Sequence, residues 1–438
     1  MDTAEIQEMT YTELERITWR SKQDPEAEFH CLMHHFGNAA LIHCFEQLDG
    51  KKAVGVDGVD KESYGKDLFG NIQRLVQKLK DMAYRPLPVR EVLIPKEGKP
   101  GATRPLGISI FEDKIVQKRM QEVLESIYEP LFLECSFGFR PGRGCHDAIK
   151  ALQNHLYYNE IQTVIDVDLK NFFGTIDHKL LLDFLKEKIK DTKLIRYIER
   201  MFKAGVLSEG DLTISDEGVQ QGSICSPILS NIFAHYVVDV WIKEMVQPNC
   251  KGQGALFRYA DDLVICCQYD TDAQRIKSAL GKRLNKFKLQ LNEEKTKLVS
   301  FDKKQARKGV RQETFDFLGF TFYWSKSRTG KTIPKLKTRA KTIRAKLKKV
   351  SDWAKQERNM MPLKELWPRF VSKLRGHVQY YGVSHNVEKV NQFLREASRI
   401  MFKWLNRRSQ RKSFTWEKFD LFVKRFPLPT ARVVHSLF

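Results

Sequence analysis

The chain has 438 residues, of which 42% are hydrophobic and 11% aromatic, so it can form two or three packed domains and is not intrinsically disordered. Its 75 Lys and Arg against 54 Asp and Glu give a formal net charge of +21, which favours a polyanionic partner, nucleic acid first and an anionic membrane surface second. No stretch approaches the roughly 18 consecutive apolar residues of a membrane span, and the first ten residues are acidic rather than signal-like. We therefore expect a cytoplasmic protein.

Cysteine and histidine are grouped once, in FHCLMHHFGNAALIHC (residues 29–44). Their spacing is not that of a zinc finger, and the segment has the length and apolar content of a helix. None of the eight cysteines forms a CxxC pair, so zinc-ribbon and redox motifs are excluded. We expect reduced core thiols and a packed helix whose histidines line its polar edge.

The N-terminal third alternates helical and extended patterns. Apolar residues recur at helical spacing through the first 50 residues, a turn follows at Gly55–Asp60, and residues 67–84 are again helical. Residues 84–109 read as short extended pieces broken by Pro and Gly, which predicts a two-stranded arm with a basic, glycine-rich turn. A helix is predicted from Asp113 to Tyr128.

The middle of the chain contains the strongest strand signals. QTVIDVDL (162–169) leads into a helix within residues 170–189, and FRYADDLVICC (257–267) has the pattern of a hairpin. A helix at 271–287 and the extended TFDFLGFTFYW (314–324) follow. This order predicts an α+β fold built on a sheet with helices on one face.

From Lys331 onward the chain becomes strongly basic. KTIPKLKTRAKTIRAKLKKV (331–350) has nine basic residues and no acidic one, so pairing with acidic residues one helical turn away is impossible. We predict long basic helices that continue to Arg408 and bind structured RNA through its phosphates, with affinity that falls with salt. The remaining tail mixes basic and aromatic residues, including Phe419, Phe422 and Phe426, and is expected to contact nucleic acid.

Paired aspartates mark the candidate catalytic site. A turn explains one of Asp261 and Asp262, but not both. If the strand that ends at Asp168 lies beside this hairpin, three carboxylates meet. A polymerase needs two divalent ions about 3.5–4 Å apart, and Mg²⁺ prefers oxygen ligands.

The motifs together resemble the reverse transcriptases encoded by bacterial group II introns, from about Arg20 to the last residue. The segments that carry the resemblance are GVDGVD, IPKEGKPGATRPLGIS, FGFRPGRGCHDAI, DVDLKNFFGTIDH, GVQQGSICSPILSNI, FRYADDLVI, LNEEKTKLVSF, FDFLGFTFYW and KLRGHVQYYG. The resemblance implies a right-hand polymerase with fingers, an antiparallel-sheet palm and a helical thumb. It implies an N-terminal helical extension at 1–54, fingers at 55–128, a palm with finger-derived insertions at 129–328, a thumb or maturase domain at 329–406 and a short C-terminal segment at 407–438.

The resemblance also implies a role for each matching residue. Asp168, Asp261 and Asp262 match the catalytic carboxylates that hold two Mg²⁺ ions, for which Mn²⁺ can substitute. Lys96 and Arg104 match residues that hold the incoming triphosphate, and Phe173 matches an aromatic gate that excludes a 2′-hydroxyl; one ring of the Phe172–Phe173 pair is expected in the core. Residues with which the family contacts template, nucleotide or primer are matched here by Gln221, Gly222, Lys295 and Arg140.

Two positions depart from the family pattern. Gln220 stands where the family commonly has Pro in PQGG, with Ser223 at the end of that block, and Gly174 stands where it often has Asp. Neither removes a metal ligand, so they bear on fidelity or substrate preference rather than on activity.

The expected function is RNA-directed DNA synthesis by a protein that binds its own intron RNA, assists splicing and copies RNA into cDNA during intron mobility. Its expected partners are structured RNA, an RNA template with a DNA primer, dNTPs and target DNA, without a membrane. No cysteine-rich endonuclease segment is seen. Two alternatives stay open: a group II-derived enzyme recruited to another role, such as phage defence with a dedicated non-coding RNA, and an RNA-binding splicing factor with a vestigial polymerase.

Overall fold

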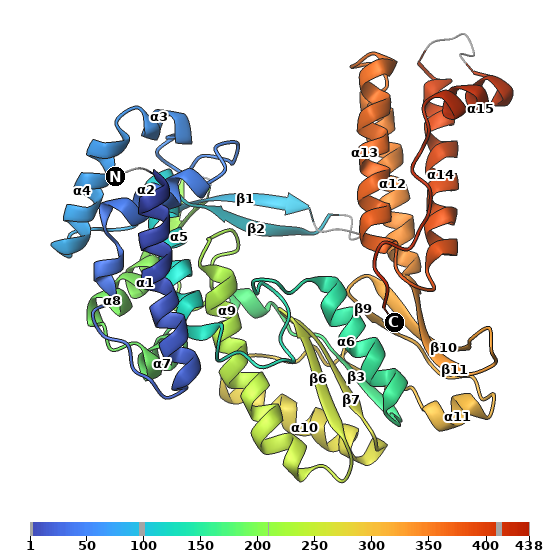
Figure 1. The fold of residues 1–438 in the computed structure, drawn as a ribbon, viewed down its shortest axis with the longest axis horizontal. Helices are drawn as coiled ribbons and strands as arrows, with labels where there is room; N and C mark the ends of the chain where they lie inside the picture. Colours follow the sequence, from blue (N-terminus) through green and yellow to red (C-terminus); the bar gives the residue numbers. More distant parts are fainter. Residues whose placement is uncertain (1–2, 96–100, 209, 409–413, 438) are drawn as a thin grey trace.

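The computed structural model describes residues 3–95, 101–208, 210–408 and 414–437. Three β-sheets and the helices around them form the predicted α+β fold. An N-terminal helical lobe and an upright bundle of C-terminal helices rise on either side of a central sheet (Figure 1). Within the described ranges, no helix is both long and apolar enough to cross a bilayer.

Helix α5 (Phe111–Tyr128) forms the centre of the N-terminal lobe, because most of its length is buried. The other helices of this lobe are α1 (Thr3–Gln23), η1 (Leu32–His35), α2 (Asn38–Gln47), α3 (Lys61–Gly65), α4 (Leu68–Lys80), α7 (His178–Lys188) and α8 (Thr192–Lys203). Asp60, Asp67, Asp177 and Asp191 begin α3, α4, α7 and α8, and each side chain accepts a hydrogen bond from a backbone N–H of the first turn. These N-caps fix where the four helices start.

The predicted single helix at residues 29–44 is wrong: the segment forms η1 and α2. Cys31 adopts a left-handed conformation with φ of 55°, and Gly37 is the N-cap of α2, so the helix is interrupted twice. His35 is buried, with Nδ1 3.2 Å from Glu13 Oε2. All eight cysteines are free, and half of them are buried: Cys44, Cys225, Cys266 and Cys267.

The predicted two-stranded arm is present and extends into a small sheet. β1 (Val89–Pro95) and β2 (Thr103–Ile108) are antiparallel, with Ile94 opposite Arg104. β4 (Val206–Ser208) and β5 (Asp211–Thr213) complete the order β2-β1-β4-β5. The turn of the arm, which includes Lys96, lies outside the described residues.

The central sheet is antiparallel throughout, in the order β6-β7-β3-β8. Its strands are β6 (Gly254–Tyr259), β7 (Asp262–Cys267), β3 (Thr163–Val167) and β8 (Lys297–Ser300). Ile165 and Ile265 pack with α10 (Asp270–Lys286) on one face. Val164 and Val264 belong to a second core with α6 (Cys145–Tyr158) on the other face. Helices therefore cover both faces, and the expectation of helices on one face is wrong.

Helix α9 (Ser226–Ala234) is continued by wider turns. Two π-helical turns follow, η3 (His235–Asp239) and η4 (Ile242–Val246), and the 3₁₀ turn η5 (Gln247–Asn249) ends the run. A π-helical turn changes the direction of the side chains that follow it. Here the first wide turn carries Asp239, which is fully buried.

A third sheet separates the central sheet from the helical bundle. β9 (Phe315–Phe317), β10 (Phe320–Lys326) and β11 (Thr332–Thr338) are antiparallel in the order β11-β10-β9. The strands of TFDFLGFTFYW therefore do not join the central sheet. The prediction that a helix starts at Lys331 is also wrong, because Ile333 and Leu336 are buried by strand pairing before the first bundle helix begins.

The C-terminal helices form the bundle in Figure 1. They are α12 (Ala340–Glu357), α13 (Leu363–Tyr381), α14 (Val387–Leu405) and α15 (Trp416–Arg425), with the short α11 (Lys303–Arg307) below them. Phe419 is buried, and Phe422 packs against Trp367 of α13 with ring centroids 4.7 Å apart. Phe419 and Phe422 therefore belong to the protein core rather than to a nucleic-acid surface, whereas Phe426 is 46% exposed. Residues 409–413 lie outside the described part.

Candidate active site

The aspartate pair of FRYADDLVICC is divided between a turn and a strand. Tyr259 pairs with Asp262 across β6 and β7, so Ala260 and Asp261 form the two-residue turn of the hairpin. Such turns require positive φ values, and Ala260 has φ of 57°. The hairpin therefore places Asp261 at its tip and Asp262 at the start of β7.

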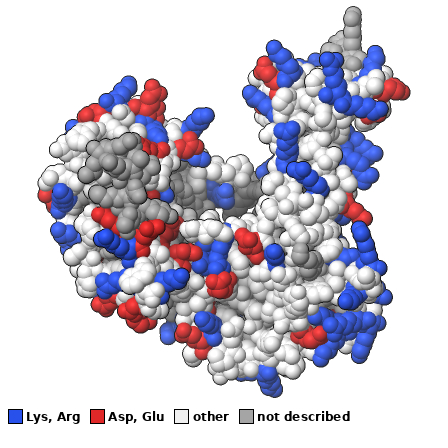
Figure 2. All heavy atoms as spheres, in the orientation of Figure 1, with Lys and Arg blue, Asp and Glu red and all other residues white. Residues whose placement is uncertain are grey.

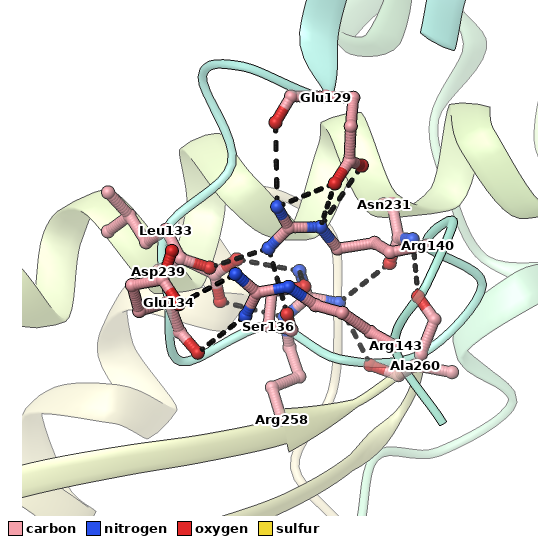
Figure 3. A network of polar contacts seen from close by, with 11 residues as sticks. Glu129, Leu133, Glu134, Ser136, Arg140, Arg143, Asn231, Asp239, Arg258 and Ala260 are labelled. Atoms are coloured by element: carbon pink, nitrogen blue, oxygen red, sulfur yellow. Dashed lines mark hydrogen bonds and ion pairs between the residues drawn. The ribbon is translucent and has the colours of Figure 1, made fainter. Parts of the chain in front are cut away.

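A buried arginine fixes this turn from behind (Figure 3). Arg258 is 1% exposed, and its Nε and Nη2 donate to the two carboxylate oxygens of Asp239 at 2.7 and 2.6 Å. Its Nη1 donates to Asn231 Oδ1 at 2.9 Å and to the carbonyl of Ala260 at 3.2 Å, and Nη2 also donates to Ser136 Oγ at 2.6 Å. A buried ion pair with its remaining donors satisfied is rigid, so the backbone just before Asp261 has one position.

Asp168 follows β3 directly and lies beside the hairpin. The β3–β7 register, which pairs Val167 with Leu263, places Asp168 next to the start of β7. Its Oδ1 accepts hydrogen bonds from Asn292 Nδ2 at 2.8 Å and from Lys295 Nζ at 3.1 Å. The carboxylate is thus oriented by two side chains of the LNEEKT segment.

Burial and, second to it, repulsion by like charges raise the pKa values of Asp261 and Asp262. The pKa of Asp261 is raised because protein displaces water around it and because Asp168 repels its charge. The pKa of Asp262 rises to about 6, first by loss of hydration and then by repulsion from Asp261 and two further carboxylates. Both side chains still reach solvent, so the loss of hydration is partial. Asp166, on β3, has a pKa of about 6, chiefly through burial.

This carboxylate group has the chemistry that a hard divalent cation requires. Its donors are oxygens, and a cation would relieve the repulsion that raises the pKa values of Asp261 and Asp262. Among the described residues, no three His, Cys, Asp or Glu side chains form a ready-made ligand set. Mg²⁺ usually keeps water and substrate phosphates in its coordination shell.

A cleft of about 920 Å³ opens beside the aspartates. Its walls come from the β1–β2 arm, from the loops at residues 168–174 and 217–221, and from the turn that carries Asp261, with Lys349 of α12 at one side. Six of the ten predicted site residues line it: Arg104, Asp168, Phe173, Gln221, Asp261 and Lys295. Of the others, Lys96 lies outside the described residues, whereas Asp262, Arg140 and Gly222 are not part of the lining.

Two neighbouring phenylalanines both line the cleft, and one of them is also part of the core. Phe172 is 2% exposed and belongs to the core. Phe173 lines the cleft, together with Gly174. A Cβ at Gly174 would collide with the side-chain amide of Asn171. An Asp at this position, which the family pattern often has, would require Asn171 to move.

Gln221 and Gly222 attach the cleft wall to the β1–β2 arm. The Gln221 carbonyl accepts a hydrogen bond from Gly107 N at 2.7 Å. Gly222 has φ of 110°, and a Cβ there would collide with the Gly107 carbonyl. Glycine is therefore needed at this position for contact with β2. The expected close approach of a ligand to Gly222 stays a prediction.

Arg140 is occupied inside the protein rather than exposed toward template or primer. It is 8% exposed, and its Nε and Nη2 donate to the Glu129 carboxylate at 2.8 to 3.1 Å. Its Nη1 donates to the carbonyls of Leu133 and Ser136 at 2.8 and 2.9 Å (Figure 3). This geometry corrects the expected nucleic-acid contact: Arg140 holds its own loop in place.

Several residues around the site were missed from the sequence. Arg258, Asn292 and Phe139 orient or line it, and none belongs to an obvious charged or metal-ligand pattern. An arginine inside the apolar run of β6 was the available signal, since a buried arginine must be paired.

Comparisons with known proteins assign the chain to a family. Residues 94–322 match the family model described as reverse transcriptase (RNA-dependent DNA polymerase). The group II intron-encoded protein LtrA of Lactococcus lactis subsp. cremoris is 28% identical over 461 residues, covering 87% of this chain and 75% of LtrA. Protein YkfC of Escherichia coli (strain K12) is 32% identical over 328 residues, covering 66% of this chain and 82% of YkfC. A putative COX1/OXI3 intron 1 protein of Saccharomyces cerevisiae is 29% identical over 354 residues, covering 70% and 41%.

Proposed function

Because this chain belongs to the reverse transcriptase (RNA-dependent DNA polymerase) family, we propose that its cleft extends a DNA primer on an RNA template. The observation that carries this proposal is the meeting of six predicted site residues in one cleft of about 920 Å³. They come from segments more than 150 residues apart, from Arg104 to Lys295. A surface turn with surplus charge would not gather a basic arm, an aromatic ring and carboxylates around one cavity.

The architecture supports an assignment of the lobes to a right-hand polymerase. The N-terminal extension (1–54) and the fingers (55–128) form the helical lobe with the β1–β2 arm. The palm (129–328) contains the central sheet and contributes α7 and α8 to that lobe. The thumb (329–406) is the α12–α14 bundle together with β11, and the described residues 414–437 of the C-terminal segment (407–438) pack on it.

Each of the six predicted residues that line the cleft, and Asp262 beside them, has a task in nucleotidyl transfer. Asp168 and Asp261 would hold two Mg²⁺ ions, which activate the primer hydroxyl and hold the leaving phosphates, while Asp262 adjusts the local field. Arg104 binds the triphosphate of the incoming dNTP, with Lys295 close by, since guanidinium and ammonium groups both bind phosphate. Phe173 lies under the sugar and excludes a 2′-hydroxyl, and Gln221 lies beside the templating base pair.

The surface charge supports structured RNA as the partner. Basic side chains gather over α11 and the β10–β11 hairpin, at the lower right of Figure 2. The exposed residues there are Lys304, Arg307, Lys308, Arg311, Lys326, Arg328 and Lys331. Helix α12 adds a further basic surface on the thumb. Since LtrA is named as a group II intron-encoded protein, we infer that this RNA is the chain's own intron, whose splicing and mobility the protein assists.

A primer-extension assay tests the polymerase. We expect Mg²⁺-dependent cDNA synthesis by the natural protein and none by the double variant Asp261→Ala/Asp262→Ala. Asp183→Ala, which removes an exposed carboxylate of α7, is the matched control and should remain active. Full activity of the double variant would overturn the metal-site assignment, and sequencing of copurifying RNA would identify the bound RNA.

A further inference from the structure

Phe139 has an unusual backbone conformation without the burial that normally accompanies a large aromatic residue. Its φ is 57°, in the left-handed region that bulky L-residues rarely adopt. Its side chain is 47% exposed, so core packing does not compensate for the strain. Strained residues of this kind concentrate at functional sites, where the surrounding structure imposes them.

The residues on both sides of Phe139 are fixed. Arg140 is held by Glu129 and by two backbone carbonyls, as described above. The Gly138 carbonyl accepts a hydrogen bond from Asn231 Nδ2 at 2.7 Å, and Gly138 lies so close to the Ala260 amide that a Cβ would collide with it. Asn231 and Ala260 are in turn bonded to Arg258 (Figure 3). One network therefore fixes both the Phe139 backbone and the turn that carries Asp261.

The exposed ring of Phe139 belongs to the wall of the cleft. It meets Phe173 edge to face, with ring centroids 6.4 Å apart and an interplanar angle of 76°. Arg104 and Lys295 supply the basic groups of the same wall. These cations suit the phosphates of a nucleotide, whereas two aromatic rings suit the apolar surfaces of its base and sugar.

We propose that Phe139 contacts the nucleoside part of the incoming nucleotide directly and forms, with Phe173, a two-ring wall of the nucleotide pocket. The inference rests on the proposed polymerase function and adds a contact residue to it. The Arg258 network keeps the ring in place against the strain of its backbone, so the wall is preformed before the nucleotide binds. Such preformed contacts raise affinity because little ordering remains to be done on binding.

The test separates a binding role from a structural one. Phe139→Ala should raise the KM for dNTPs roughly tenfold, the size expected for losing one aromatic contact to a base. The melting temperature should stay unchanged, and Phe139→Gly should raise it, because glycine adopts this φ without strain. Phe69→Ala, which removes a 65% exposed phenylalanine of α4, is the matched control and should leave the KM unchanged.

Three results would overturn the proposal. One is a large fall in melting temperature in Phe139→Ala, which would mean that the ring serves stability. Another is an unchanged KM for dNTPs with weaker primer–template binding, which would place the ring on the nucleic acid. The last is an unchanged KM with weaker discrimination against ribonucleotides, which would mean that Phe139 acts only through Phe173. Primer extension by the natural protein is measured in parallel, so failure of the polymerase assignment itself is recognised separately.

Discussion

Replacing Arg258 by Met should both destabilise the protein and weaken catalysis. The change leaves the Asp239 carboxylate buried without a partner and takes a donor from the Ala260 carbonyl. Removing one partner of a buried ion pair costs about 3–5 kcal/mol. At a few degrees per kcal/mol, the melting temperature should fall by something on the order of 10 °C.

A second variant separates the two effects. Arg258→Met/Asp239→Leu removes both charges, and apolar replacement of a complete buried pair is often close to neutral, so most of the lost stability should return. Primer extension should remain impaired by roughly 100-fold, because the turn before Asp261 is no longer held and small misplacements of reacting groups are costly. The assays are thermal melting and single-nucleotide extension at a temperature where every variant is folded. If the double variant regains both stability and full extension, Arg258 has no role in positioning Asp261.

The remaining predictions concern charge. The folded-state pKa of Asp262, about 6, lies above its ordinary 3.8, so this group contributes stability below about pH 4 and loses that contribution as the pH rises through 6. Asp262→Asn should therefore melt higher than the natural protein at pH 8, with a difference that disappears by pH 4; equal melting at both pH values would refute the raised pKa of Asp262. Lys295→Ala should raise the KM for dNTPs several-fold without changing primer–template affinity in a filter-binding assay, since its ammonium lies in the cleft. Arg311→Ala/Lys326→Ala should reduce the salt dependence of RNA binding by about two phosphate contacts, and an unchanged slope would remove this surface from the RNA interface.

The sequence predicted best those helices and strands whose apolar residues follow a single spacing pattern. The apolar runs around the aspartates predicted β3, β6 and β7, and helical spacing predicted α5 and α10. The strand β11 was missed because its lysines were counted as part of a basic helix, although Ile333 and Leu336 lie in an extended segment. The run of basic residues in this segment favours a helix, whereas the spacing of its apolar residues favours a strand. Pairing with β10 makes it a strand.

In the candidate site, too, some residues could be predicted from the sequence and others could not. Residues inside contiguous motifs, such as Asp168 and Asp261, could be named from the sequence. Contacts between distant segments could not: Asn292 reaches Asp168 across 124 positions. Arg140 was assigned to nucleic acid because its partner Glu129, eleven positions earlier, is identifiable only in the folded loop.

The π-helical turns after α9 make this stretch sensitive to length rather than to composition. Asp239 ends the first wide turn and meets Arg258 from there. The wide turn already takes up one residue more than an ordinary helical turn, so inserting one further residue between Ala234 and Asp239 would rotate every later side chain by about 100° around the axis. Asp239 would then turn away from Arg258, even though every chemical group of the network was still present. Substitutions in this stretch should thus be tolerated far better than single-residue insertions.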